Sequence, residues 1–302
     1  MLLFVFFVLL VGSFLTGILI LRQGLYTLSG ESLKTWLQTY TKTPTRGLIA
    51  GTICTGILQS SSVVTVMTIG FVSAGILTFQ QSIGIILGTN IGTTVTLELF
   101  SISISQLIIP LLLLGLLLSI FQKVFLKSLG FIFIGLSIVL LSMNGLELFS
   151  DSLQKNLDFS SNFRSPVISL LFGIVFAACV QSSTATTAFA MSLVSSQLIG
   201  IEGGILIMFG ANIGTCITAL FASIGGGKEA RLTAWVHVWL NVIGVGACLP
   251  LVRLLGDLAQ LLSSDPAVQL AHASVIFNVG TSLLVLPFTS QFERFVLFVH
   301  DR

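Results

Sequence analysis

Long apolar stretches separated by short polar breaks run along the whole chain, and this pattern predicts helices that cross a membrane. Residues 1–21 are uncharged and long enough to span a bilayer. No small-residue cleavage pattern occurs there, so we expect a retained transmembrane helix and not a signal peptide. Further full spans are expected at 106–122, 129–148, 231–252 and 268–290.

Two of the polar breaks occur twice. The stretch Gln59-Ser60-Ser61-Ser62 reappears, shifted by 122 positions, as Gln181-Ser182-Ser183-Thr184. In both copies Asn-Ile-Gly-Thr begins 31 positions after the glutamine, at 90–93 and at 212–215. Flanking glycine and proline positions match at the same shift, so the chain contains an internal duplication.

The glutamine-serine motif lies at the end of a segment too short to cross a membrane. About 11 apolar residues separate Gly47 from Gln59, which at about 1.5 Å per residue reaches roughly half-way through a bilayer. A half-length helix must turn back, so we expect re-entrant helical hairpins at 47–79 and 166–200 with the motifs at their tips. A single kinked span at 47–79 is the alternative.

The asparagine-glycine motif lies near the middle of a segment long enough to span. Gly88 and Gly92 tolerate unwound backbone, so we expect broken transmembrane helices at 81–101 and 203–223. The alternative is that these glycines and their counterparts Gly210 and Gly214 allow close helix packing, as Gly-x-x-x-Gly usually does.

These elements predict an all-α polytopic membrane protein with two repeats. The first repeat covers 1–126, the second 127–252, and a C-terminal helix and tail cover 253–302. Three expected crossings separate the two hairpins, and an odd number puts them on opposite sides of the membrane. The repeats are therefore expected to be inverted, as in many transporters.

Composition supports the membrane assignment and removes several classes of function. Charged residues are 8% and hydrophobic residues 54% of the 302 residues, so a lipid bilayer is the expected surrounding. A net charge of +2 gives no sign of a nucleic-acid partner, and we expect none. The four cysteines lack metal-ligand or redox spacing. No catalytic triad, carboxylate pair or metal constellation is expected inside the membrane, so we do not expect an enzyme or a cofactor.

The basic residues predict the orientation of the chain. Ten of them fall on the side of the first hairpin's ends and three on the other side. By the positive-inside rule the richer side is cytoplasmic, which puts the N-terminus outside and the C-terminus inside a bacterial inner membrane. The ten are Arg22, Lys34, Lys42, Arg46, Lys123, Lys127, Lys228, Arg231, Arg294 and Arg302, and the three are Lys155, Arg164 and Arg253.

The chemistry of the two motifs points to an anion and a cation. Each tip offers a glutamine amide, hydroxyls and the free N–H groups of a helix start, which favour an oxyanion, and we expect the two tips to meet at mid-bilayer. Each broken helix presents an asparagine and two threonines at intervals of three, on one helical face. The neutral oxygens of these side chains suit sodium. The residues are Asn90, Thr93, Thr96, Asn212, Thr215 and Thr218.

Other polar residues receive less specific assignments. His237, His272, Asn241 and Asn278 are expected mainly to satisfy contacts between helices. Glu98 is expected to face solvent or lipid headgroups because it lies near the end of its helix.

The paired motifs Q-S-S-S with G-T-N-I-G-T and Q-S-S-T with G-A-N-I-G-T resemble those of the sodium/phosphate cotransporter family, whose bacterial members are related to the mammalian type II cotransporters. The resemblance implies uptake of inorganic phosphate coupled to Na+, with phosphate near both glutamine-serine stretches. It further implies a sodium site shared by Gln181, Ser182, Ser183, Thr215 and Thr218. The family's His-x-x-x-Asn element occurs at His237 to Asn241 and, with Ser274 replacing histidine, around Asn278, which suggests supporting roles for these residues.

One departure from the family pattern affects the stoichiometry. The aspartate that electrogenic mammalian members carry after the first broken helix has no counterpart between Thr96 and Gln106. The number of sodium ions and the form of phosphate therefore stay open, as do a homodimer and the direction of flux. A sodium-coupled carrier of another oxyanion, such as sulfate or a carboxylate, or a phosphate exporter is the alternative function.

Overall fold

The computed structural model describes residues 2–41, 43–101, 105–148, 163 and 165–300, which form helices and no strand. The predicted all-α fold is therefore confirmed. Six helical segments in these residues are long and apolar enough to cross a membrane, so the chain is a polytopic membrane protein.

The predicted first repeat contains α1 (Leu2–Tyr40), α2 (Pro44–Leu58), α3 (Ser61–Ser73), α4 (Phe79–Ser101), the short η1 (Ser105–Leu107) and α5 (Ile108–Ser119). The second contains α6 (Val124–Leu148), α9 (Pro166–Val180), α10 (Ser183–Ser195), α11 (Ile201–Gly214), α12 (Cys216–Ala222) and α13 (Gly227–Cys248). The chain continues through η2 (Leu249–Leu251), α14 (Val252–Leu262), α15 (Pro266–Val285), η3 (Leu286–Phe288) and α16 (Thr289–His300).

The duplication seen in the sequence is also present in the helix bounds. Shifting α2 and α3 by 122 positions gives the bounds of α9 and α10, and the same shift carries the start of α4 onto the start of α11. The hairpin helices have 15 and 13 residues in each repeat. At about 1.5 Å per residue they are about 20 Å long, shorter than a hydrocarbon core of about 30 Å, which is the length that a re-entrant hairpin requires.

Several predicted boundaries are wrong. The helix expected at 1–21 continues well beyond its predicted end, because α1 has 39 residues and curves beneath α2 and α3. The full span expected at 106–122 is only 12 residues of α-helix in α5. The C-terminal helix expected at 268–290 is present as α15, which ends at Val285, but it is flanked by α14 and α16, which were not expected. The segment between the span expected at 129–148 and the hairpin expected at 166–200 lies mostly outside the described residues.

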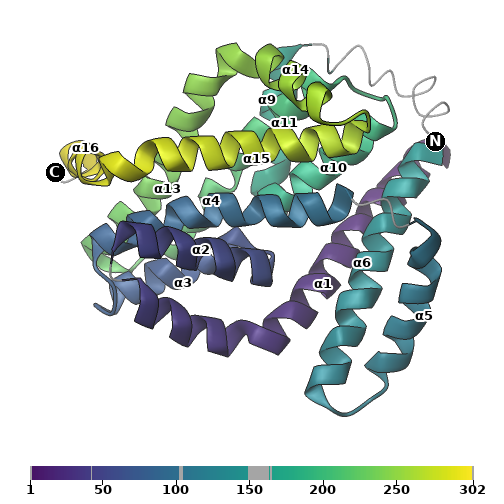
Figure 1. The fold of residues 1–302 in the computed structure, drawn as a ribbon, viewed down its shortest axis with the longest axis horizontal. Helices are drawn as coiled ribbons and strands as arrows, with labels where there is room; N and C mark the ends of the chain where they lie inside the picture. Colours follow the sequence, from purple (N-terminus) through teal and green to yellow (C-terminus); the bar gives the residue numbers. More distant parts are fainter. Residues whose placement is uncertain (1, 42, 102–104, 149–162, 164, 301–302) are drawn as a thin grey trace.

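The first helices of the two repeats pack against each other at one side of the molecule. Figure 1 shows α1 and α6 side by side, with α5 beyond α6. Gly17 faces Val139, and Gly24, about two helical turns further on, faces the earlier residue Ser128, so the helices are antiparallel. Equivalent helices in inverted repeats must be antiparallel, and the inverted topology itself stays a prediction.

Glycines bring each first hairpin helix against the following long helix. A Cβ atom at Gly88 would overlap the carbonyl oxygen of Leu48 on α2, and one at Gly210 would overlap that of Leu170 on α9. The helix expected to be broken at 81–101 is instead continuous as α4. The first prediction of unwinding is therefore wrong, and the close-packing alternative is confirmed, because these glycines remove side chains from a helix-to-helix contact.

The second repeat does contain an interruption, between α11 and α12 at Thr215. The Asn212 carbonyl accepts hydrogen bonds from Thr215 Oγ1 at 3.2 Å and from Cys216 Sγ at 3.3 Å. Side-chain donors of this kind compete with the helix's own N–H groups for the carbonyl. The next turn is tighter, since Thr218 N donates to Thr215 O, three residues back, at 3.1 Å.

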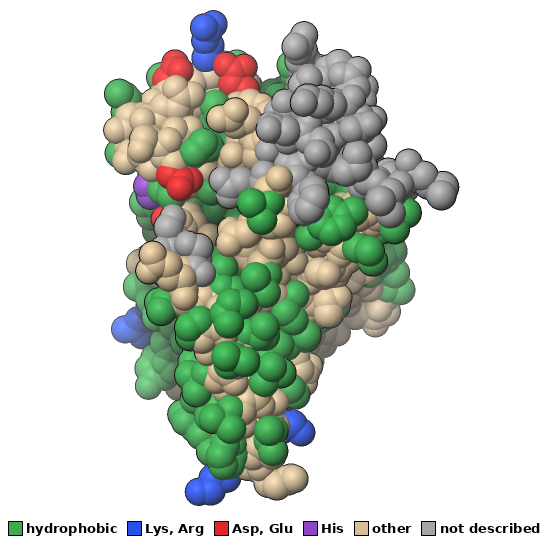
Figure 2. Space-filling view, turned by 90° about the vertical axis from the view of Figure 1, so that its right-hand side faces the viewer, with side chains coloured by type: hydrophobic (Ala, Val, Ile, Leu, Met, Phe, Trp, Pro, Cys, Tyr) green, Lys and Arg blue, Asp and Glu red, His purple; other side chains and the backbone are tan. Residues whose placement is uncertain are grey.

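The outer surface matches a lipid environment. Figure 2 shows hydrophobic side chains over much of one face, with basic side chains at the bottom, the left edge and the very top, and acidic ones toward the top. On α5, Leu113 and Leu117 are 61% and 56% exposed. Exposed leucines in such number fit a surface covered by acyl chains.

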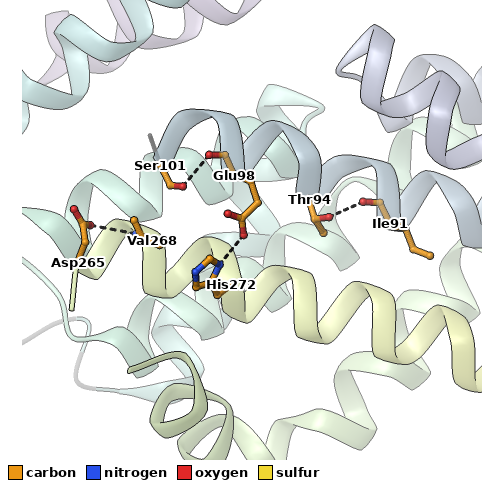
Figure 3. Close-up of polar contacts among 7 residues, drawn as sticks. All are labelled: Ile91, Thr94, Glu98, Ser101, Asp265, Val268 and His272. Atoms are coloured by element: carbon orange, nitrogen blue, oxygen red, sulfur yellow. Dashed lines mark hydrogen bonds and ion pairs between the residues drawn. The ribbon is translucent and has the colours of Figure 1, made fainter. Parts of the chain in front are cut away.

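A polar contact joins α4 to α15. His272 Nδ1 lies 2.8 Å from Glu98 Oε1, as Figure 3 shows. The assignment of His272 to an interhelical contact is confirmed. Glu98, expected to face solvent or headgroups, also pairs with this histidine, because α15 passes beside the end of α4. The Glu98 side chain keeps 34% of its surface exposed.

The glycine contacts predict an unequal response to added methyl groups. We expect Gly88→Ala to lower the free energy of unfolding by about 1–3 kcal/mol or more, because the new Cβ meets backbone that has no room to move. Gly70→Ala on α3 is the control, since a Cβ there meets no atom within 4 Å, and it should raise stability by up to about 1 kcal/mol. Thermal unfolding in detergent measures both, and equal midpoints would contradict the packing role.

Candidate functional site

Both hairpin tips have the same backbone shape. Gln59 (φ 52°, ψ 32°) and Gln181 (φ 56°, ψ 36°) end the first helix of each hairpin in the left-handed region. Ser60 and Ser182 follow in extended conformation and cap the next helix, accepting from Val63 N at 3.3 Å and from Ala185 N at 3.0 Å. The capping serine is thus the reason that α3 and α10 start where the motif predicts.

The two tips meet, as expected from the sequence. Ser62 Oγ in the first tip donates to the Gln181 carbonyl in the second at 3.1 Å. Arg22 of α1 reaches both tips: its Nε donates to Gln59 O at 3.2 Å and its Nη2 to Ser182 Oγ at 2.5 Å. Segments about 120 residues apart in sequence therefore form one polar centre.

The tips differ in exposure. Their serines and Thr184 are largely buried, except Ser62, which is partly exposed. Gln59 is 8% exposed, and its Oε1 has no hydrogen-bond partner among the described residues. Gln181, its counterpart, is exposed. The centre is therefore more open beside the second tip than beside the first.

The motif-bearing central helices lie between the hairpins. α4 packs against α2, α3 and α10, and α12 packs against α3 and α9. Thr93, Thr215 and Thr218 donate their hydroxyl protons to carbonyls of their own helices. Each such oxygen keeps an acceptor lone pair. Thr96 Oγ1 and Asn212 Nδ2 are buried and have no partner in the described part of the chain.

A chain of polar contacts connects the central helices of the two repeats. Asn90 Nδ2 donates to Asn241 Oδ1 at 3.4 Å, and Asn241 Nδ2 donates to His237 O at 2.9 Å and to Cys216 Sγ at 3.5 Å. Cys216 Sγ in turn donates to the carbonyl of Asn212. The two motif asparagines are thus joined through α13.

The remaining family-like residues contribute less. The ring of His237 is buried, and its Nδ1 has no partner in the described residues, so the interhelical contact expected of this side chain is not seen. Asn278 donates within its own helix, to the carbonyl and hydroxyl oxygens of Ser274. No described hydrogen bond joins His237, Asn241 or Asn278 to the hairpin tips.

Arg22 is the residue that sequence reasoning placed wrongly, because it was counted among the cytoplasmic charges. The structure puts it at the hairpin tips, which leaves nine basic residues for that side by the original count. A signal was present in the sequence: Arg22 lies within the apolar stretch Val5–Leu28. A charge inside a spanning helix is by default a functional residue.

A duplicated helical membrane protein with two polar tips at a shared centre has the architecture of a secondary transporter. The profile of the Na+/Pi-cotransporter family matches residues 13–148 and again 145–278. The chain therefore belongs to the Na+/Pi-cotransporter family, which is a family of transporters.

Individual relatives extend the comparison. The uncharacterized protein YqeW of Bacillus subtilis is 38% identical over 98% of both chains. YjbB of Escherichia coli, provisionally named an inorganic phosphate export protein, is 25% identical over 92% of this chain, which spans 52% of YjbB. Human sodium-dependent phosphate transport protein 2B is 36% identical over 30% of this chain and 14% of its own length. No solved structure matches the chain significantly.

The contact between the tips predicts an engineered cross-link. In a background with the four native cysteines replaced by alanine, Ser62→Cys combined with Gln181→Cys should be joined by a short thiol-reactive cross-linker. The control pairs Ser62→Cys with Gln197→Cys, exposed at the far end of α10 and about 20 Å from the tip along the helix. Mass spectrometry of the purified protein reads out both pairs; equal yields would show that the tips are not held together.

Proposed function

We propose that this chain is a secondary active transporter that couples inorganic phosphate to the sodium gradient by alternating access. The observation that carries the proposal is the hydrogen bond between Ser62 of one tip and Gln181 of the other, which unites both motifs in one centre. The names of the family and of human protein 2B, which refer to sodium and phosphate, support the choice of ions.

In this proposal phosphate binds between the two tips. The starts of α3 and α10 present free N–H groups and a partial positive charge, which stabilise an oxyanion. The binding residues are Gln59, Ser60, Ser61, Ser62, Gln181, Ser182, Ser183 and Thr184.

Sodium binds beside the second tip in this proposal. Thr215 and Thr218 lie at the interruption between α11 and α12, where the backbone departs from regular helix. With Gln181, Ser182 and Ser183 they supply neutral oxygens, and Asn90, Thr93, Thr96 and Asn212 line the surrounding helices. No carboxylate belongs to this set, so sodium depends on the negative charge of the anion, and each ion should raise the affinity of the other.

The difference between the repeats supports alternating access. Gln59 is buried while Gln181 is exposed, and α4 is continuous while α11 and α12 are separate. In a transporter built from two equivalent halves, exchange of the two conformations between the halves opens the centre to the other side. The structure then represents one of the two end states.

Phosphate export is the second candidate, and the name of YjbB favours it. Export uses the same oxyanion site with flux in the opposite direction. The substrate gradient and the sodium gradient decide the direction of a coupled carrier, so a transport assay with controlled gradients separates the two candidates.

We expect liposomes that contain the purified chain to accumulate labelled phosphate when sodium is higher outside. A potassium gradient of equal size is the control for ionic strength and should give no accumulation. Equal uptake with potassium would remove sodium coupling, and equal competition by sulfate would favour the broader oxyanion carrier. Sodium-independent release of phosphate from loaded vesicles would favour export.

Single hydroxyl deletions should separate the two ions. Ser183→Ala and Thr215→Ala should raise the sodium concentration for half-maximal uptake by about tenfold, because each removes one oxygen ligand of a charged group. Ser61→Ala should mainly weaken phosphate binding, measured at saturating sodium. Thr68→Ala, which removes a buried hydroxyl two turns further along α3, is the matched control. It should change neither the sodium concentration for half-maximal uptake nor the affinity for phosphate. Unchanged sodium dependence in both of the first variants would exclude Ser183 and Thr215 from the site.

A further inference from the structure

Arg22 is a cation placed where the two repeats meet. It belongs to α1, which packs on α6 and also contacts α2 and α10. Its guanidinium donates to a backbone carbonyl of one tip and to a serine hydroxyl of the other. The residue is partly exposed, and its two contacts place the guanidinium between the tips.

The charge of Arg22 has no protein counter-ion in the described residues. The ion pair found there joins His272 to Glu98, and no described carboxylate lies within 4 Å of the guanidinium. Both groups that Arg22 contacts are neutral. A cation withdrawn from water without a partner is costly, and it is retained where a ligand supplies the opposite charge.

The geometry of the guanidinium suits an oxyanion with several oxygens. Of its five N–H donors, two have partners among the described residues, through Nε and Nη2. The remaining donors form part of a planar fork that matches two oxygens of a phosphate or carboxylate. The contact to Ser182 fixes this fork beside the start of α10.

A second observation at the same place also points to a ligand. Gln59, whose carbonyl accepts from Arg22, has a side-chain Oε1 without a partner in the described residues although the residue is only 8% exposed. Buried polar atoms are normally hydrogen-bonded. Because Oε1 is an acceptor, its absent partner is a donor or a cation, such as sodium or the hydroxyl group of a protonated oxyanion.

We propose that Arg22 binds the transported oxyanion directly and supplies the positive charge of its site. The proposal rests on the proposed function, since it assigns a further residue to the same site. Arg22 lies outside both motifs and comes from α1, so in this proposal the anion is held jointly by the two hairpins and by α1. With one positive charge from Arg22, a divalent oxyanion leaves one negative charge for sodium to neutralise, so loss of Arg22 should also increase the dependence on sodium.

The test is phosphate binding to the purified full chain at saturating sodium. We expect Arg22→Gln to raise the phosphate Kd by at least about 30-fold, because it removes one member of a hydrogen-bonded charge pair. Arg22→Lys keeps the charge and should recover most of the affinity. Arg46→Gln, at the exposed start of α2, is the control with the same change in net charge and should stay within about twofold of the unchanged chain.

The sodium response separates a binding role from a structural one. In Arg22→Gln the sodium concentration for half-maximal phosphate binding should rise, while helicity by circular dichroism and elution as a single species should be unchanged. Phosphate Kd within about threefold of the unchanged chain in Arg22→Gln, or no recovery in Arg22→Lys, would overturn the proposal. If the unchanged chain binds no phosphate, the proposed function and the role of Arg22 both fail; if only the variant result differs, the role of Arg22 alone fails.

A measurement without variants covers the case in which Arg22→Gln does not fold. Phenylglyoxal modifies arginine side chains, and peptide mass spectrometry follows each arginine separately. Sodium with phosphate should slow modification of Arg22 and leave that of Arg46 unchanged. Equal modification rates at Arg22 with and without phosphate would contradict direct binding.

Discussion

The centre of this protein depends on a backbone turn that occurs twice, a left-handed glutamine followed by an extended serine. Left-handed conformation is unfavourable for residues other than glycine, by about 1–2 kcal/mol, so its presence at both Gln59 and Gln181 requires compensation. The compensation is visible in the caps that Ser60 and Ser182 form and in the bonds that tie the tips to each other and to Arg22. The turn ends one helix, starts another and leaves donors facing the centre.

Close backbone contact supports these tips. Glycines bring α2 against α4 and α9 against α11, without intervening side chains. Each hairpin is thus fixed to a long central helix, and the central helices contact both hairpins. The polar chain through Asn241 then joins the asparagines of the two repeats. The site is therefore supported by close packing of small residues. In a membrane the hydrophobic effect does not drive helices together, so close van der Waals contact through small residues takes its place.

Much of this arrangement was predictable from local pattern. The predicted start of the first hairpin, at residue 47, lies three residues from the observed start of α2 at Pro44. This agreement is possible because a proline, a capping serine and a short apolar run specify a helix by local rules. Whether α4 unwinds or stays continuous at Gly88 was not predictable in the same way. Glycine tolerates both an open backbone and a close neighbour, and only the position of Leu48 on α2 shows which of these applies. In the second repeat the equivalent helix is interrupted at Thr215. There the side chains of Thr215 and Cys216 donate to the Asn212 carbonyl.

The sequence by itself determined the membrane environment, the duplication, the helical class and the two polar motifs, since each is expressed in composition or in spacing along one segment. Only the tertiary structure decided which atoms join the two tips, that α15 brings His272 to Glu98, and that Arg22 lies at the centre instead of at the membrane surface. The physical reason is that these are contacts between segments far apart in the chain. A side chain's partner across such a distance depends on how every intervening helix packs, which no local pattern of residues contains.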